Sequence, residues 1–174
     1  DHRANYETDF PVIQQHRKNG LGHRRTIEQT MRVAYAVTDP QAVGAVGQAL
    51  SEIRGLQSQM QIDFGRATSM ATSPRIGKWH NVKVNVGGKN EVRDLRVILR
   101  TEREEADRVV DGIVRTLEER IDAFNTINNR LRTADEAQQK LDQHLTDAGN
   151  LFPASRDLDS LRGTLLSDLE ETAG

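Results

Sequence analysis

The chain contains no cysteine among its 174 residues, and aromatic residues make up only 4% of it. The absence of cysteine excludes disulfides, thiolate catalysis and cysteine-based zinc sites. No apolar run approaches the roughly 20 residues that a membrane-spanning helix needs, so we expect no membrane span in this fragment. With 36% hydrophobic residues, the composition favours helices with narrow apolar stripes over sheets that are buried on both faces.

The formal net charge of −2 is unevenly distributed along the chain. Residues 1–100 carry a net charge of +6, whereas residues 101–174 carry −8. Such a division can orient contacts between copies or attract anionic partners to the first half, or it can reflect two solvated surfaces that simply differ. The chain begins with Asp1 rather than methionine, so we interpret it as a fragment or a processed product.

The first 25 residues show little hydrophobic periodicity and contain Pro11, Gly20 and Gly22. Proline and glycine disfavour the interior of a helix. We therefore predict a basic extended arm over residues 1–25, with at most one short helix, followed by a helical domain over residues 26–172.

Two long segments carry apolar residues at alternating steps of three and four, which is the pattern of helices that pack side by side. The first covers residues 39–71 and opens with Asp39 and Pro40, a capping residue followed by a proline suited to the first helical position. The second covers residues 101–148, and a helix of this length would measure about 70 Å. The residues predicted to form the helix-packing interface are Val43, Val46, Leu50, Ile53, Met60, Val110, Ile113, Leu117, Phe124, Ile127, Leu131, Leu141 and Leu145.

A strand pattern separates these two segments. Valines alternate with polar residues over 82–86, and a turn cluster follows at 87–90. Residues 92–100 fit either a second strand or a helical stripe. The sequence from Thr101 to Glu104 matches a capping box and therefore favours a helix that starts near residue 101. We accordingly predict a β-hairpin over residues 79–100.

The predicted fold class is mainly α: long, heptad-patterned, coiled-coil-like helices in a helical hairpin or bundle, with a small β-hairpin insertion. The two heptad segments could pair within one chain with the hairpin at their tip, or the longer helix could pair between chains. A last amphipathic helix, capped by Ser155 or Asp157, could fold back on the long helix or dock on a neighbour. Its apolar face would consist of Leu158, Leu161, Leu165 and Leu169.

Histidines and carboxylates are present, but their spacing and surroundings do not indicate a catalytic or metal site. His16 and His23 lie seven residues apart among four cationic side chains, which would repel a metal ion. We interpret the histidines as solvated or capping residues. The carboxylates alternate with arginines as on a solvated helix surface, and the glycines match no phosphate-binding loop. We therefore predict that the chain is not an enzyme, and we expect no catalytic residue, no metal and no cofactor.

Cationic residues of the arm and the hairpin could contact an anion or a nucleic acid. The candidates are Arg17, Lys18, Arg24, Arg25, Arg75, Lys78 and Lys83. The overall negative charge and the absence of a recognisable nucleic-acid-binding motif argue against this interpretation. Lysines beside an exposed strand also have an ordinary structural role, because they protect the strand edge from pairing with other chains.

The leading hypothesis is a non-enzymatic structural or assembly subunit that self-associates or bridges components of a larger complex, so the expected partner is protein. Polar residues within the heptads, namely Gln57, Arg120 and Gln138, would then fix the register and the number of partners, although Arg120 could instead extend its charged end into solvent. One alternative is an extracytoplasmic helical sensor or ligand-binding domain of a membrane protein, which suits a fragment. A second alternative is nucleic-acid binding through the basic arm and the hairpin.

Overall fold

The computed structural model describes residues 1–151 and 155–173, and the side chains of residues 1–151 and 161–173. The mainly α fold with a small β-hairpin is confirmed. The elements follow one another as α1 (His2–Tyr35), the short 3-10 helix η1 (Pro40–Ala42), α2 (Val43–Ala71), β1 (Asn81–Val86), β2 (Lys89–Asp94), α3 (Leu95–Leu151) and α4 (Ser155–Ala173). The chain divides into two units, residues 1–125 and residues 126–174, and each is described by itself.

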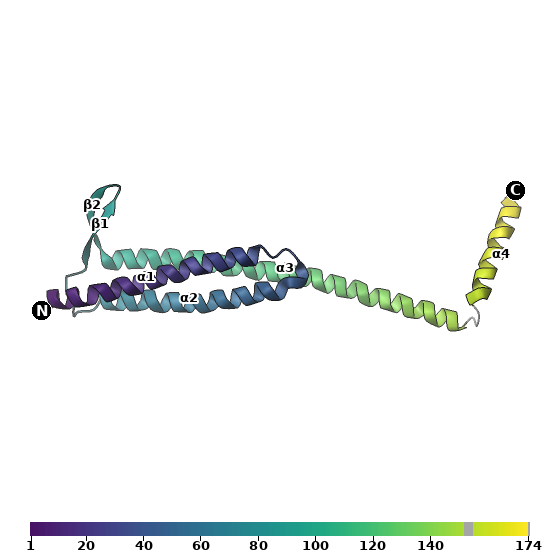
Figure 1. The fold of residues 1–174 in the computed structure, drawn as a ribbon, viewed down its shortest axis with the longest axis horizontal. Helices are drawn as coiled ribbons and strands as arrows, with labels where there is room; N and C mark the ends of the chain where they lie inside the picture. The colour runs from purple at the N-terminus through teal and green to yellow at the C-terminus, as the bar shows by residue number, and fades with distance from the viewer. Residues whose placement is uncertain (152–154, 174) are drawn as a thin grey trace. The chain divides into compact units, whose positions relative to one another are not determined.

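In the first unit, α1, α2 and the first part of α3 lie side by side and alternate in direction, as an up-down-up three-helix bundle (Figure 1). The β-hairpin lies between α2 and α3, at the end of the bundle that carries the N-terminus (Figure 1). Pairing of the two predicted heptad segments within one chain is therefore confirmed for the first part of α3, and α1 completes the bundle as a third helix.

Residues 1–25 are helical rather than extended, because they form most of α1. Asp1 caps this helix by accepting a hydrogen bond from the backbone N–H of Arg3. Pro11 and Gly20 each disfavour a helix interior, by about 3 and 1 kcal/mol, yet both lie within α1. Packing outweighs this cost, since every seventh residue of α1 is buried in the bundle: Ile13, Gly20, Ile27 and Ala34. The predicted extended arm is therefore wrong.

The connection between α1 and α2 agrees with the sequence-based expectation. The side chain of Asp39 accepts a hydrogen bond from the backbone N–H of Gln41 at 2.9 Å, and Pro40 is the first residue of η1. A capping aspartate followed by proline satisfies one free backbone donor and needs no hydrogen bond from the proline itself.

The β-hairpin is present but shorter than predicted. Its antiparallel register pairs Asn81 with Asp94 at one end and Val86 with Lys89 at the other. The turn consists of two glycines with φ values of 59° and 82°, a conformation that residues with a side chain rarely adopt. The second strand ends at residue 94, so the last residues of the predicted hairpin belong to α3.

Helix α3 begins at Leu95 rather than near Thr101. Asp94 accepts a hydrogen bond from the backbone N–H of Arg96 at 2.9 Å, as an N-cap residue does. Leu95 and Leu99 are buried one helical turn apart, so the apolar residues of this ambiguous stretch form a helical stripe. The capping-box prediction at Thr101 is therefore wrong, because the helix is already capped upstream.

The bundle has two clusters of buried apolar residues. The smaller cluster lies near the hairpin and joins all three helices to β1 through Ile13, Ala67, Ala71, Val82, Leu95 and Leu99. The larger cluster fills the rest of the bundle with Ile27, Ala34, Val46, Ala49, Leu50, Ile53, Met60, Phe64, Ala106, Val110, Ile113, Leu117 and Phe124. Both clusters draw on α1, so packing supports this helix from about Phe10 to Ala34.

Helices α1 and α2 pack closely where Gly20 faces Phe64. A Cβ atom added to Gly20 would lie 2.8 Å from ring carbon Cε2 of Phe64, well inside van der Waals contact. The phenyl ring is fully buried, so it has little room to move away. Glycine at position 20 therefore provides the space that the ring occupies.

The second unit contains the remainder of α3 and helix α4. Helix α4 confirms the predicted last helix, and Leu161, Leu165 and Leu169 on it are exposed. The side chains of Leu158 and of the two expected capping residues lie outside the described part of the structure. Within residues 1–151 and 155–173, no helix combines the length and the apolar character needed to cross a bilayer.

Candidate functional site

The predicted helix-packing residues fall into two groups. The first group lies in the bundle, where Val43 packs against the core half-buried and the others are buried: Val46, Leu50, Ile53, Met60, Val110, Ile113, Leu117 and Phe124. The second group belongs to the second unit, on α3 after residue 125, and is exposed: Ile127, Leu131, Leu141 and Leu145. The structure therefore accounts for the packing of the first group and leaves the second group open to a partner.

We define the exposed seam as the a and d heptad positions of α3 after residue 125, namely Ile127, Leu131, Ala134, Gln138, Leu141, Leu145 and Ala148. Its four large apolar side chains are 41%, 50%, 52% and 64% exposed, in chain order. The positions of the seam continue the heptads that are filled inside the bundle up to Phe124. Exposed large apolar side chains that gather on one face commonly mark a site of interaction.

Gln57 and Gln138, the two glutamines within the heptads, have different surroundings. Gln57 on α2 donates a hydrogen bond from Nε2 to Oδ1 of Asp111 on α3 at 3.0 Å. Gln138 on the exposed seam donates to Oδ1 of Asp142 at 3.2 Å, one turn further along the same helix. The first glutamine therefore links two helices, whereas the hydrogen bond of the second stays within one helix.

Arg120 interrupts the heptads of α3 and forms hydrogen bonds with the backbone at the C-terminal end of α1. Its Nη2 atom donates hydrogen bonds to the backbone carbonyl oxygens of Val37 and Tyr35, at 2.6 and 3.3 Å. Its guanidinium carbon lies 4.9 Å from the ring centroid of Tyr35 and 5.0 Å from that of Phe124. A cation suits the carbonyl end of a helix and the faces of aromatic rings. Arg120 therefore does not extend its charged end into solvent, which was one of its two predicted roles.

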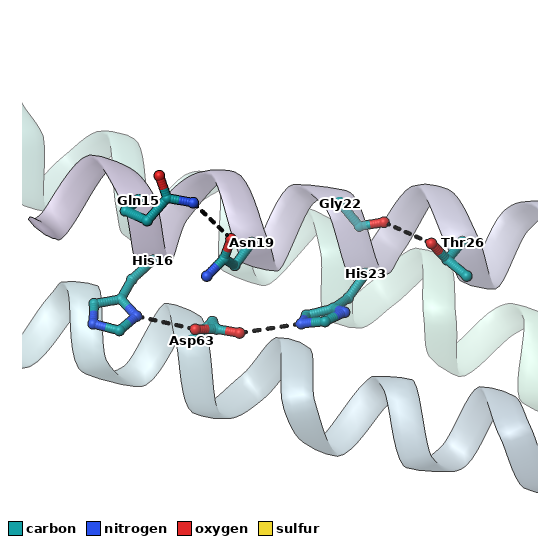
Figure 2. Close-up of polar contacts among 7 residues, drawn as sticks. All are labelled: Gln15, His16, Asn19, Gly22, His23, Thr26 and Asp63. Atoms are coloured by element: carbon teal, nitrogen blue, oxygen red, sulfur yellow. Dashed lines mark hydrogen bonds and ion pairs between the residues drawn. The ribbon is translucent and has the colours of Figure 1, made fainter. Parts of the chain in front are cut away.

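Two histidines of α1 share one carboxylate of α2 (Figure 2). Nδ1 of His16 lies 3.0 Å from Oδ1 of Asp63, and Nε2 of His23 lies 3.2 Å from Oδ2 of the same residue. All three side chains are largely buried. The spacing of seven residues places both imidazoles on one face of α1. The interpretation of these two histidines as solvated or capping residues is therefore wrong, and the carboxylate between them was not predicted. Nδ1 of His80 lies 3.3 Å from Oδ1 of Asp94, but it makes no hydrogen bond to it.

The contacts of His16 and His23 with Asp63 connect two helices, and they do not assemble a ligand set. Among the described residues, no group of three or more histidine, aspartate or glutamate side chains is placed to hold a metal ion. The chemistry of the cluster is therefore hydrogen bonding between α1 and α2, with one carboxylate accepting from two imidazoles.

Three of the cations suggested for nucleic-acid contact are engaged within the bundle. Arg17 donates from Nε to Glu102 at 2.7 Å, and this hydrogen bond raises the pKa of Arg17 against the opposing effect of burial. Arg24 pairs with Glu28 and Glu105, and Arg75 pairs with Asp9 at 3.0 Å. In the described part of the chain, the other candidates have neither an ion pair nor a side-chain hydrogen bond: Lys18, Arg25, Lys78 and Lys83. Nucleic-acid binding stays a prediction.

Comparisons with known proteins identify no relative of this chain. No protein-family profile matches the sequence. No curated protein and no solved structure shows significant similarity to the chain. The functional interpretation therefore depends on the geometry of the exposed seam alone.

Proposed function

We propose that this chain is a non-enzymatic assembly subunit that self-associates through the exposed seam of α3. The observation that carries the proposal is the continuation of one heptad pattern from the filled interior of the bundle onto an exposed helix surface. A heptad seam gains stability only when another helix inserts its side chains between those of the first. The bundle supplies such neighbours up to Phe124, and a partner would supply them from Ile127 onward.

The apolar surface of the seam is sufficient for a modest affinity. Complete burial of one large apolar side chain contributes about 1.5–3 kcal/mol, and two seams would bring together twice the four large residues of one helix. Association costs about 4–15 kcal/mol in lost translational and rotational freedom. The two alanines and Gln138 reduce the apolar area that can be buried. We therefore expect association that is reversible and depends on concentration.

The second part of α3 also requires support as a helix. Several side-chain contacts link residues one turn apart, including Arg132 with Glu136 and Gln143 with Asp147. Each such contact stabilises an exposed helix by only about 0.2–0.5 kcal/mol. Because most helical stability in proteins comes from the packing of an apolar face, burial of the seam would stabilise this helix more than its local contacts do.

The test is sedimentation equilibrium of the full chain over a wide range of concentrations. We expect the wild-type chain to have an average mass above that of one chain, decreasing on dilution. The double variant Leu131→Asp/Leu141→Asp places two charges in the seam, and it should have the mass of a single chain throughout.

The matched control is Asn129→Asp/Gln139→Asp, which adds the same charge to α3 outside the a and d positions. It should associate like the wild type, and thermal unfolding of the bundle should be equal in all three proteins at low concentration. A double seam variant that keeps the wild-type mass would contradict the proposal, and so would a wild-type chain that stays single at several hundred micromolar.

A further inference from the structure

We infer that the partner on the exposed seam is a second copy of this chain, aligned parallel and in register. The inference rests on the proposed function and adds direction and register to it. It follows from the charges beside the seam and from Gln138 within it.

The positions that flank the seam carry opposite charges at the spacing that a parallel pair requires. Arg130 occupies a g position and Asp135 the e position five residues later. In a parallel pair, a g residue of one helix faces that e residue of the other. Both side chains are exposed, and neither makes a hydrogen bond or ion pair within the described residues. Two-fold symmetry would form the contact between Arg130 and Asp135 twice.

An antiparallel pair would bring like charges together instead. In that arrangement the e positions of the two helices face each other, as do the g positions. The e row of the seam includes Asp135 and Asp142, whereas the g row includes Arg130 and His144. Asp135 and Asp142 of one helix would therefore lie in a row that faces the same two carboxylates of the other helix, which is unfavourable. The charges beside the seam distinguish the two directions.

Gln138 selects the register of the parallel pair. It occupies an a position, and in register its amide faces the same amide of the second copy. An amide has both donor and acceptor atoms, so two facing glutamines can satisfy each other. A shift by one heptad would place the amide against Leu131 or Leu145. The carbonyl oxygen of Gln138, which the hydrogen bond to Asp142 does not use, would then be buried without a partner. The in-register arrangement avoids this penalty.

Thiol cross-linking of the full chain tests direction and register, and the absence of native cysteine removes any background. The variants Ala134→Cys and Ala148→Cys each place one thiol at a d position. In a parallel, in-register pair, each variant cross-links to its own kind with a short bismaleimide. The two positions are about 21 Å apart along the helix, so an antiparallel pair allows at most one of them to meet its own counterpart.

Charge reversal provides an independent test in the same sedimentation measurement. In a parallel pair, Asp135→Arg places Arg130 against an arginine, and we expect self-association to weaken roughly tenfold. Arg130→Asp should weaken it similarly, and a mixture of the two variants should restore pairing as a heterodimer. The matched control is Arg132→Asp at a b position, which should associate like the wild type.

The outcomes separate this inference from the proposed function. If Asp135→Arg strengthens self-association, the pair is antiparallel, and the inference fails while the seam remains the interface. Association that the seam variant Leu131→Asp/Leu141→Asp abolishes, but with self-cross-linking at only one of the two cysteine positions, also overturns the parallel register alone. A chain that stays single at all concentrations overturns both. Self-cross-linking at both positions, with weakening by Asp135→Arg, supports both.

Discussion

Helix α3 places the same kind of residue in two different environments. Leu117 is fully buried in the bundle, whereas Leu131, two heptads later at the same seam position, is half exposed. Nothing in the local pattern distinguishes these two leucines. They differ in what surrounds them, because within residues 1–125 the first lies against α1 and α2. A heptad pattern thus specifies which face of a helix is suited to packing. Whether a helix of the same chain covers that face depends on where the neighbouring helices end.

The polar contacts of the bundle and of α3 after residue 125 also differ in which residues they connect. In the bundle, Asp63 contacts the side chain of His16, and Arg120 donates to the backbone carbonyl of Val37. In both contacts the two residues are far apart in the sequence. Beyond residue 125, the described hydrogen bonds of Gln138 and Gln143 reach only one turn along α3. Polar groups in the bundle therefore help to determine how helices are arranged, whereas those on α3 after residue 125 support a single helix.

The largest expected effect comes from truncating the two equivalent leucines. Leu117→Ala should reduce the free energy of unfolding by about 2–5 kcal/mol, because it leaves a cavity in a packed core. Leu131→Ala should change it by less than about 0.5 kcal/mol, measured by chemical denaturation at a concentration low enough to prevent association. Equal losses in the two variants would show that the exposed seam is already covered within one chain.

The second effect concerns the close packing of α1 on α2. Gly20→Ala should destabilise the bundle by about 1–3 kcal/mol, since the new methyl group overlaps the buried ring of Phe64. Gly22→Ala is the matched control, because a Cβ at that position meets nothing within 4 Å. It should instead stabilise the helix by up to about 1 kcal/mol. Stabilisation by both substitutions would show that the ring moves freely.

An effect of similar size is expected at the shared carboxylate. Asp63→Ala removes the acceptor of both His16 and His23 and should lower the free energy of unfolding by about 1–3 kcal/mol. Asp147→Ala removes an exposed acceptor on the second part of α3 and should have little effect. Thermal unfolding of the two variants at neutral pH makes the comparison. An equal response would mean that the histidine contacts contribute nothing to the bundle.

The smallest effect is a pH dependence at the start of α3. The hydrogen bond from Arg96, together with the charge of His80, lowers the pKa of Asp94 against the opposing effect of desolvation. A carboxyl group with a lower pKa in the folded state stabilises the fold above its unfolded pKa of about 3.9, and this contribution is lost as the pH falls through the folded value. Asp94→Asn should therefore reduce the loss of stability between pH 5 and pH 2, measured by denaturation at each pH. The same acid response in both proteins would exclude this contribution.

The sequence predicted those elements whose signals are local. Asp39 and Pro40 marked the start of the helical segment over residues 39–71, and the alternating valines marked the hairpin. The heptads of α2 identified side chains such as Ile53 and Met60 that are buried in the bundle. In each case the relevant periodicity or capping residue lies within a few residues of the element that it specifies.

Other features depend on contacts between distant residues. Pro11 and Gly20 suggested that residues 1–25 are not helical. Helix α1 continues through both of them because the residues buried on it, such as Ile13 and Ile27, recur at multiples of seven residues and pack in the bundle. The proximity of Asp63 to two histidines could be predicted only from how α1 faces α2, which the sequence does not state. The exposure of the seam after Phe124 could likewise be predicted only from which side chains fill the bundle, because the heptads themselves continue unchanged.

The contact between Gly20 and Phe64 restricts the order in which this protein can change over generations. A larger residue at position 20 is acceptable only after position 64 has become smaller, because the reverse order places two groups in the same space. Replacing Phe64 first leaves a cavity, which weakens the bundle but keeps its geometry, and a methyl group at position 20 can then fill part of it. Descendant chains should therefore retain glycine with phenylalanine, or should have exchanged both residues through a smaller side chain at position 64.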